Sequence, residues 1–259
     1  MTLSLPVARI FPIVIWIVGW IPFLRGNASL NDGLAALAAA GLALFSARHA
    51  WRDVSAPPAT PQVAGAVILA GLGLVTDFTL LIAIALVLLA CPAGAAKARA
   101  NDELRLLALL SLPWLATDGT SLALAFRHSA AWTTEAFFQV FGFAVSREGT
   151  TLTIEGQPLA VAAACAGLDT LHATLVAGAW LAAALRRRKL FWSAVAALPL
   201  LAWVANTSRV IALGGVAITW GPNAAIGWFH TWGGLAVVVV MFALAGAWVA
   251  VLRQSDRAP

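Results

Sequence analysis

Long apolar runs, interrupted by short polar segments, dominate the chain. Where a run is bounded by charged or turn-forming residues, it predicts a membrane-spanning helix. Eight such helices are expected, at about residues 8–24, 32–47, 62–76, 78–96, 104–126, 165–185, 190–213 and 231–252. Several are shorter than the roughly 20 residues of an upright spanning helix, so we expect tilted helices or local thinning of the bilayer. The pattern predicts an all-α polytopic membrane protein.

The boundaries of two apolar runs bear on the topology. Only Thr76 and Asp77 separate the third run from the fourth, so residues 62–96 fit either two spans or one long tilted helix. A single helix there would invert the orientation of every element before it. Near the N-terminus, Arg9 precedes the apolar residues 10–24, and no small-residue cleavage site follows them. We therefore interpret this run as a retained membrane anchor.

Residues 127–164 carry a different pattern, first amphipathic and then alternating. Residues 151–155 (Thr-Leu-Thr-Ile-Glu) and 158–161 alternate on either side of Gly156, which predicts a small β-hairpin on the outer face of the membrane. Its polar side chains Thr151, Thr153 and Gln157 are candidates for binding an extended substrate peptide, because strands can bind peptides by strand addition. A loop that merely links two helices is the alternative.

Composition and charge agree with a membrane protein and set its orientation. The chain is 61% hydrophobic and 10% charged, against about 25% charged in soluble domains, which excludes an ordinary soluble enzyme and a nucleic-acid-binding protein. With the N-terminus inside, twelve of the sixteen Lys and Arg residues lie on the cytoplasmic side. The positive-inside rule then predicts a multi-pass protein of the cytoplasmic (inner) membrane with both termini in the cytoplasm. The four outer cations are Arg25, Arg127, Arg147 and Arg209.

Three polar side chains from different predicted helices fall at the same outer level: Cys165, Arg209 and His230. Ionisable groups inside a span cost about 2.5–3.5 kcal/mol each, so those that remain are functional candidates. A thiol needs a neighbouring base or cation to become a thiolate, which His230 can supply. Arg209 can stabilise the oxyanion that forms when the thiolate adds to an amide, and Asn206 lies one helical turn earlier. Cys165, Arg209 and His230 together predict acyl transfer, and Asn206 is a supporting residue that could hold Arg209 or the substrate backbone.

Other polar residues leave alternatives open. Asp169 and His172 share a helical face with Cys165, so a local relay through these two supporting residues competes with one through His230. We expect Asp118 to be buried with an Arg or hydroxyl partner, and Cys91 to be structural. Two cysteines form no disulfide framework. Taken singly, each proposed catalytic residue also has a purely structural interpretation.

At these residues the sequence resembles the exosortase/archaeosortase family of membrane transpeptidases. The resemblance rests on the hairpin with residues 161–168 (Val-Ala-Ala-Ala-Cys-Ala-Gly-Leu), on residues 205–210 (Ala-Asn-Thr-Ser-Arg-Val), and on His230 with Gly233-Gly234. It covers about residues 125–240. It divides a single integral membrane domain (1–259) into N-terminal helices (1–124), an exosortase-like catalytic region (125–252) and a cytoplasmic tail (253–259).

The resemblance implies a cysteine peptidase or transpeptidase with Cys165, Arg209 and His230 as catalytic residues on the outer side. Its substrates would be exported proteins with a C-terminal sorting signal, namely a motif such as Pro-Glu-Pro, a transmembrane span and a basic tail. Ala166 stands where the family often has serine, which leaves oxyanion stabilisation to Arg209 and backbone N–H groups. Neither a cofactor nor a metal is expected. A transporter with a path along Asp118, Asp169, His172 and Arg209, or a non-catalytic scaffold of an envelope assembly, is the alternative.

Overall fold

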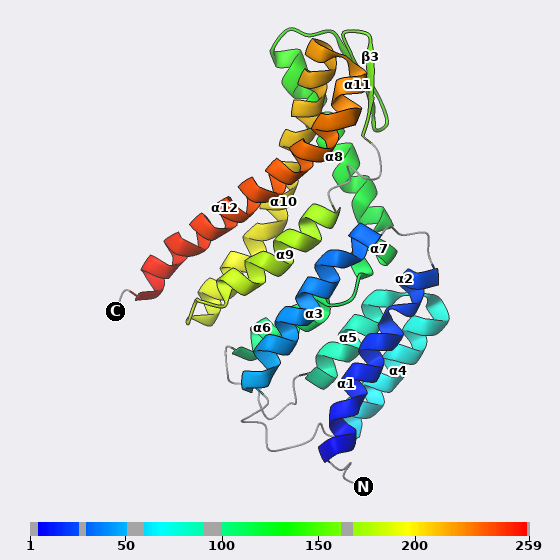
Figure 1. Cartoon of the computed structure of the whole chain (residues 1–259), viewed down its shortest axis with the longest axis vertical. Coiled ribbons are helices and arrows are strands. Elements are labelled where there is room, and N and C mark those ends of the chain that lie inside the picture. The colour runs from blue at the N-terminus through cyan, green and yellow to red at the C-terminus, as the bar shows by residue number, and fades with distance from the viewer. Residues whose placement is uncertain (1–4, 26–29, 51–59, 91–99, 162–167, 258–259) are drawn as a thin grey trace.

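The protein is mostly helical with one small antiparallel sheet (Figure 1). The computed structural model describes residues 5–25, 30–50, 60–90, 100–161 and 168–257. The first half of this part contains α1 (Leu5–Gly19), α2 (Ile21–Arg25), α3 (Leu30–Ala50), α4 (Thr60–Thr76), α5 (Thr79–Ala90), α6 (Ala100–Leu110), α7 (Trp114–Asp118) and α8 (Thr120–Val140). The sheet follows, with β1 (Val145–Glu148), β2 (Thr151–Ile154) and β3 (Gln157–Ala160). The chain continues with α9 (Leu168–Ala182), α10 (Arg188–Trp220), α11 (Pro222–Ala224), the π-helical turn η3 (Ala225–Phe229) and α12 (His230–Arg257).

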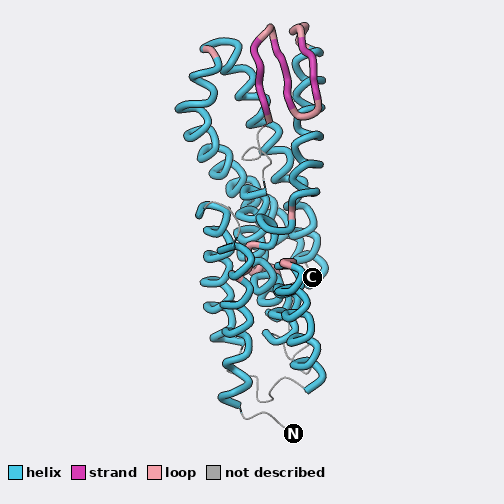
Figure 2. The backbone as a smooth tube through the Cα atoms, turned by 90° about the vertical axis from the view of Figure 1, so that its right-hand side faces the viewer, coloured by secondary structure: helices cyan, strands magenta, loops and turns pink. Residues whose placement is uncertain are grey.

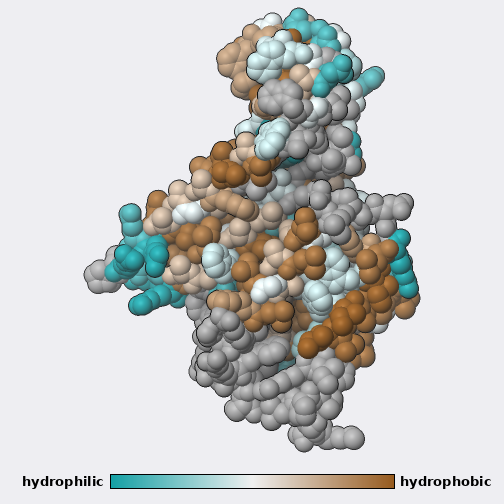
Figure 3. Space-filling model, viewed as in Figure 1, coloured by the Kyte–Doolittle hydropathy of each residue, from teal (hydrophilic) through white to brown (hydrophobic). Residues whose placement is uncertain are grey.

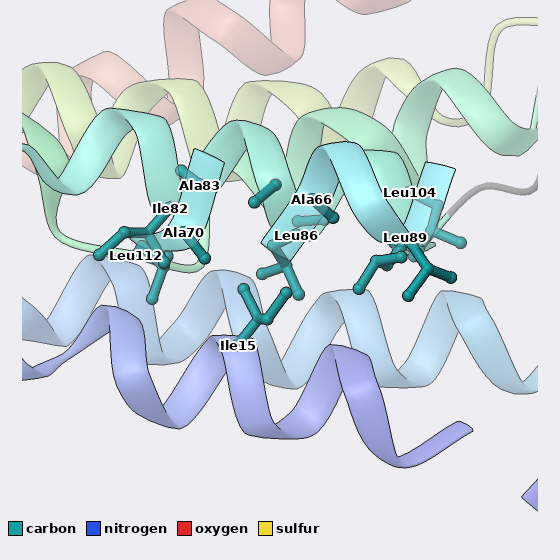
Figure 4. Close-up of a cluster of buried hydrophobic side chains, with 13 residues drawn as sticks. Ile15, Ala66, Ala70, Ile82, Ala83, Leu86, Leu89, Leu104 and Leu112 are labelled. Atoms are coloured by element: carbon teal, nitrogen blue, oxygen red, sulfur yellow. The ribbon is translucent and has the colours of Figure 1, made fainter. Parts of the chain in front are cut away.

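The N-terminal helices pack around an apolar cluster drawn from α1, α4, α5 and α6. In Figure 4, Ile15 of α1 points toward Leu86 and its neighbours on α5. Helices α4 and α5 lie side by side, and between them Asp77 adopts a left-handed conformation with φ 52° (Figure 1). Residues 60–90 therefore form two helices, and the alternative of one long tilted helix over 62–96 is wrong.

The single helix predicted over 104–126 is also wrong, because the chain breaks twice there. Helix α6 ends at Leu110 and α7 begins at Trp114, since Pro113 has no N–H to continue the hydrogen-bond ladder. The second break is at Gly119, where a Cβ would collide with the Leu115 carbonyl oxygen. Helix α8 then runs on to Val140, so the amphipathic residues 127–140 are helical.

The sheet has the strand order β1-β2-β3, with both pairs antiparallel. The predicted hairpin is confirmed as β2 and β3, whereas β1 was not predicted. Glu155 and Gly156 both have positive φ, 49° and 76°, as a two-residue hairpin turn of the primed type requires. In Figure 2 the strands lie at the end of the molecule opposite the N-terminus.

One face of the sheet packs on α8 and on the later part of α10. Leu152 and Ile154 are 0% and 1% exposed and share a cluster with residues of both helices, among them Phe138 and Val210. Arg147 of β1 also forms an ion pair with Glu135 of α8, at 2.7 Å. The sheet is thus a cap fixed to two helices.

Helix α10 is long enough to cross a bilayer and still reach this cap. Its 33 residues span about 50 Å at 1.5 Å per residue, against a hydrocarbon core of about 30 Å. Within the described residues, α10 and residues 235–257 of α12 have the length and apolar composition of spanning helices, and five shorter apolar helical stretches have 10–17 residues each. Figure 3 shows apolar surface along α12 that ends in hydrophilic residues near the C-terminus. The predicted count of eight spans is not confirmed.

Polar contacts join several helix ends far from the sheet. Asp256 near the end of α12 accepts hydrogen bonds from the N–H groups of Arg186 and Arg187, at 2.6 and 3.0 Å. Arg188 at the start of α10 pairs with Asp102 at the start of α6, at 2.6 Å. The basic segment 186–189 therefore lies beside the beginning of α6 and the end of α12.

Candidate active site

Arg209 and Asn206 lie on α10 near the point where this helix reaches the sheet. Arg209 comes 21 residues after the first residue of α10, or about 32 Å along the axis. Its side chain is half-buried, and the next residue, Val210, packs in the cluster beneath the sheet. Asn206 is 2% exposed, one turn earlier. Both residues sit about one bilayer thickness from the basic segment 186–189.

His230 is the first residue of α12 and directly follows the π-helical turn η3. The turn contains a kink at Gly227, with φ −79° and ψ −115°. This kink changes the direction of the chain just before His230. Phe229 and Gly233, on either side of His230, line the same groove as Arg209. The backbone of His230 is therefore held at the level of Arg209.

Cys165 lies outside the described residues, but both sides of its segment are fixed. Val161 is 1% exposed and belongs to the cluster beneath the sheet. Leu168, at the start of α9, packs against a second cluster that contains Ala202 and Ala205 of α10. The described residues on the two sides of Cys165 thus lie beneath the sheet, at Val161, and beside Ala205 of α10, at Leu168.

Arg127 of α8 anchors the sheet at the point where this segment begins. Its Nε–H donates to the Val161 carbonyl oxygen at 2.7 Å, and its Nη2 donates to Thr150 Oγ1 at 3.1 Å. These contacts join the start of β2 and the end of β3 to one side chain. The sequence identified Arg127 only as one of the four outer cations, because its partner at Val161 is a backbone group with no sequence signal.

The break between α6 and α7 explains the position of His172. Three successive carbonyl groups lose their helical partners there, and each receives a side-chain N–H instead. Trp114 Nε1 donates to Leu109 at 3.1 Å, and His172 Nε2 donates to Leu110 at 2.8 Å. Trp16 Nε1 donates to the third carbonyl, that of Ser111, at 3.1 Å. His172 is 2% exposed, so it fills a buried site on a helix break.

Of the three remaining candidates, Asp118, Asp169 and Cys91, the structure describes the side chain of Asp118. Asp118 accepts hydrogen bonds from the N–H groups of Thr79 and Leu80, at 3.2 and 2.6 Å, and so caps the N-terminus of α5. The expected Arg or hydroxyl partner is therefore replaced by backbone amides. Asp169 is the second residue of α9, and its side chain lies outside the described part. Cys91 is likewise outside it.

The three candidates for substrate contact do not share one face of the sheet. Thr153 pairs with Ser146 and Pro158 on the face of the sheet that points away from the core, and Thr151 lies on the same face. Gln157 pairs with Ile154, which faces the core. Because β2 is the central strand, its backbone groups already pair on both sides. Strand addition is therefore restricted to the edge strands β1 and β3, and Thr151 and Thr153 offer only their side chains.

A groove with a volume of about 610 Å³ runs between α10 and α12. It is lined from Ala197 to Ala212 on α10 and from Gly233 to Trp248 on α12, with Phe229 of η3 at one end. The lining is apolar except at the outer end, where Ser208 and Arg209 lie. Among the described residues, no group of three or more His, Cys, Asp or Glu side chains could hold a metal ion.

Comparison with known proteins assigns the chain to a family. Residues 20–247 match the family model of the transmembrane exosortase. The match covers the N-terminal helices from α2 onward, in which the sequence offers no motif. No curated protein and no solved structure matches the chain. Since the family model covers most of the sequence, the chain belongs to the transmembrane exosortases, a family of membrane transpeptidases that act on exported proteins.

Proposed function

We propose that this protein is a membrane-embedded cysteine transpeptidase that cleaves a C-terminal sorting signal from exported proteins. Cleavage takes place at the outer surface of the cytoplasmic membrane, through a thioacyl intermediate on Cys165. The observation that carries the proposal is the convergence at one level of three elements. These are the Arg209 side chain, the start of α12 at His230 and the two fixed ends of the segment that contains Cys165.

Each of the three residues has a defined task in this reaction. His230 takes the thiol proton of Cys165, and the thiolate attacks the carbonyl carbon of the scissile amide. Arg209 stabilises the negative oxygen of the tetrahedral intermediate with its guanidinium N–H groups. His230 then returns the proton to the leaving nitrogen as the C–N bond breaks. The remaining thioester passes its acyl group to an acceptor amine, or to water.

Covalent chain length is consistent with this assignment. Three peptide links separate Cys165 from Leu168, so their Cα atoms are at most about 11 Å apart. Leu168 packs against the cluster that contains Ala205, which precedes Asn206 on α10. Asn206 is buried one turn from Arg209, where its amide can orient the guanidinium or the substrate backbone.

The transporter alternative has less support. Two of the four groups in its path, Asp118 and His172, already bind backbone groups at helix ends. The groove between α10 and α12 is apolar over most of its length, whereas a transport path for ions or polar solutes needs polar lining. The scaffold alternative predicts no reaction at Cys165, so a cysteine substitution separates it from the proposal.

The proposal is tested by processing of a reporter protein with a sorting signal of motif, transmembrane span and basic tail. Cys165→Ser should abolish cleavage while the amount of inserted enzyme stays constant, because serine is a far weaker nucleophile of similar volume. Cys91→Ser is the matched control and should process normally. Full processing by Cys165→Ala, which has no nucleophile at this position, would remove covalent catalysis and favour the scaffold.

A further inference from the structure

We propose that the groove between α10 and α12 binds the transmembrane helix of the protein substrate and delivers the peptide that emerges from it to Arg209. This inference rests on the proposed function and extends it from the reacting groups to the recognition of the membrane-embedded part of the signal. The occupant is an apolar helix, packed lengthwise against both walls.

The dimensions of the groove match part of a membrane-spanning helix. Along α10 the lining extends from Ala197 to Ala212 and along α12 from Gly233 to Trp248, which is about 22 Å on each helix at 1.5 Å per residue. This length covers the outer two-thirds of a hydrocarbon core of about 30 Å. The groove is also open at the side, since Leu200 and Val240 in its walls are 65% and 54% exposed. A helix can therefore enter laterally from the bilayer.

The two walls have the composition that close helix packing requires. Lining positions recur every three or four residues on each helix, so each wall is one helical face. Small residues alternate with larger ones along these faces, including Ala205 and Ser208 on α10 and Gly233 and Ala236 on α12. Small residues let the backbones of membrane helices approach, and association of such helices depends on this contact. A lipid chain needs no such approach, so the small residues favour a helix.

Charge complementarity sets the direction of the occupant. The cation of the groove, Arg209, lies at its outer end, and the walls below it are apolar. The matching ligand is apolar along the groove and carries oxygen acceptors where it reaches the guanidinium. A transmembrane helix with an extended peptide at its outer end meets this description. The backbone carbonyls and any acidic side chain of that peptide are not used in helical hydrogen bonds, so they can accept from the guanidinium. The helix thus places the adjacent peptide bond beside the proposed catalytic groups.

Two adjacent valines of α12 provide a matched test of occupancy. Val240 lines the groove, whereas Val239 does not, and the two are 54% and 60% exposed. A photo-crosslinking amino acid at either position would be introduced into the full chain with Cys165→Ala, in membranes that contain the tailed reporter. We expect a crosslink to the span of the reporter from position 240 and none from position 239. Adducts with lipid alone at position 240, or equal reporter adducts at both positions, would overturn the proposal.

A cleavage measurement separates failure of this inference from failure of the proposed function. Val240→Trp fills the groove and should lower kcat/KM for the reporter about tenfold or more, mainly through KM, as overpacking of a helix contact does. Val239→Trp should cleave at the wild-type rate. If wild-type enzyme cleaves and both variants match it, the groove assignment is wrong and the proposed function stands. If wild-type enzyme cleaves no reporter, the proposed function fails, and the crosslinks alone decide whether the groove holds a helix.

Discussion

His172 and His230 compete for the proton-transfer role and differ in their surroundings. The ring of His172 is buried and donates to the Leu110 carbonyl at a helix break. His230 begins α12 beside the groove that holds Arg209. The bond of His172 assigns it a structural task, so the proposed mechanism uses His230.

The two histidines should therefore give different phenotypes. His230→Ala should lower turnover by about 10²–10⁴-fold in membranes with normal amounts of enzyme, the range for loss of a general acid or base. His172→Ala should leave turnover per molecule unchanged but lower the amount of folded enzyme, since an unsatisfied buried carbonyl costs about 1–3 kcal/mol. Cleavage rates normalised to inserted protein check both. The opposite assignment of the two phenotypes would favour the relay through Asp169 and His172.

Arg209 is expected to act through the shape of its guanidinium as well as its charge. Arg209→Lys keeps the charge but replaces a planar fork of N–H donors with a compact ammonium. We expect kcat to fall by about 10²–10³-fold, the usual loss when a donor to an oxyanion is removed. Single-turnover cleavage under saturating reporter measures this step. A variant with wild-type kcat and a raised KM would show that Arg209 only binds substrate.

At the scale of elements, the sheet fixes one end of the segment that carries Cys165. Arg127 holds this end through Val161 and Thr150, whereas Arg147 pairs with Glu135 of α8 and bonds to the Gly149 carbonyl at the β1–β2 turn, at 3.1 Å. The two arginines therefore attach different parts of the same sheet to α8. A substitution of Arg127 therefore alters the position of Val161, whereas a substitution of Arg147 alters only the attachment of β1 to α8.

Arg127→Gln should reduce cleavage by up to about 10²-fold, because small displacements of reacting groups have effects of this size. Arg147→Gln should process near the wild-type rate, since burial of Leu152 and Ile154 still holds the sheet. The positioning role is checked by the rate at which a thiol reagent labels Cys165, which should change with Arg127→Gln alone. If both variants lose cleavage activity equally and the labelling rate of Cys165 is unchanged, Arg127 only stabilises the sheet and does not position Cys165.

Local sequence signals explain which elements could be predicted. The alternation around Gly156 specified the β2–β3 hairpin, and Asp77 marked the turn between α4 and α5. Strand β1 was missed because Val-Ser-Arg-Glu is polar and short, and it becomes a strand only by pairing with β2. The breaks in 104–126 were missed because proline and glycine are tolerated within membrane helices when other groups satisfy the backbone.

The same limit applies to the candidate site. Residue type and order point to Cys165, Arg209 and His230, since few side chains can perform acyl transfer. The partners of Asp118 and Arg127 could not be predicted, because each side chain binds backbone groups 34 to 39 residues away. Such contacts depend on helix packing and leave no trace in local composition.

At the scale of the whole molecule, the proposed function requires that the sheet and the basic segment 186–189 lie on opposite sides of the membrane. Twelve of sixteen Lys and Arg residues fall on the side assigned to the cytoplasm. A reporter fused after Lys189 should behave as cytoplasmic, and one inserted near Gly156 as external. Accessibility to a membrane-impermeant label measures both. A reversed result would put the proposed site on the cytoplasmic side.

The most direct measurement of the central claim is capture of the covalent intermediate. Enzyme in membranes would be mixed with the tailed reporter, quenched in acid, and the peptide that contains Cys165 analysed by mass spectrometry. The proposed mechanism predicts that the N-terminal part of the reporter is attached to Cys165 through a thioester, which hydroxylamine releases. Cleaved reporter without an adduct on Cys165, together with undiminished cleavage by Cys165→Ala, would contradict it.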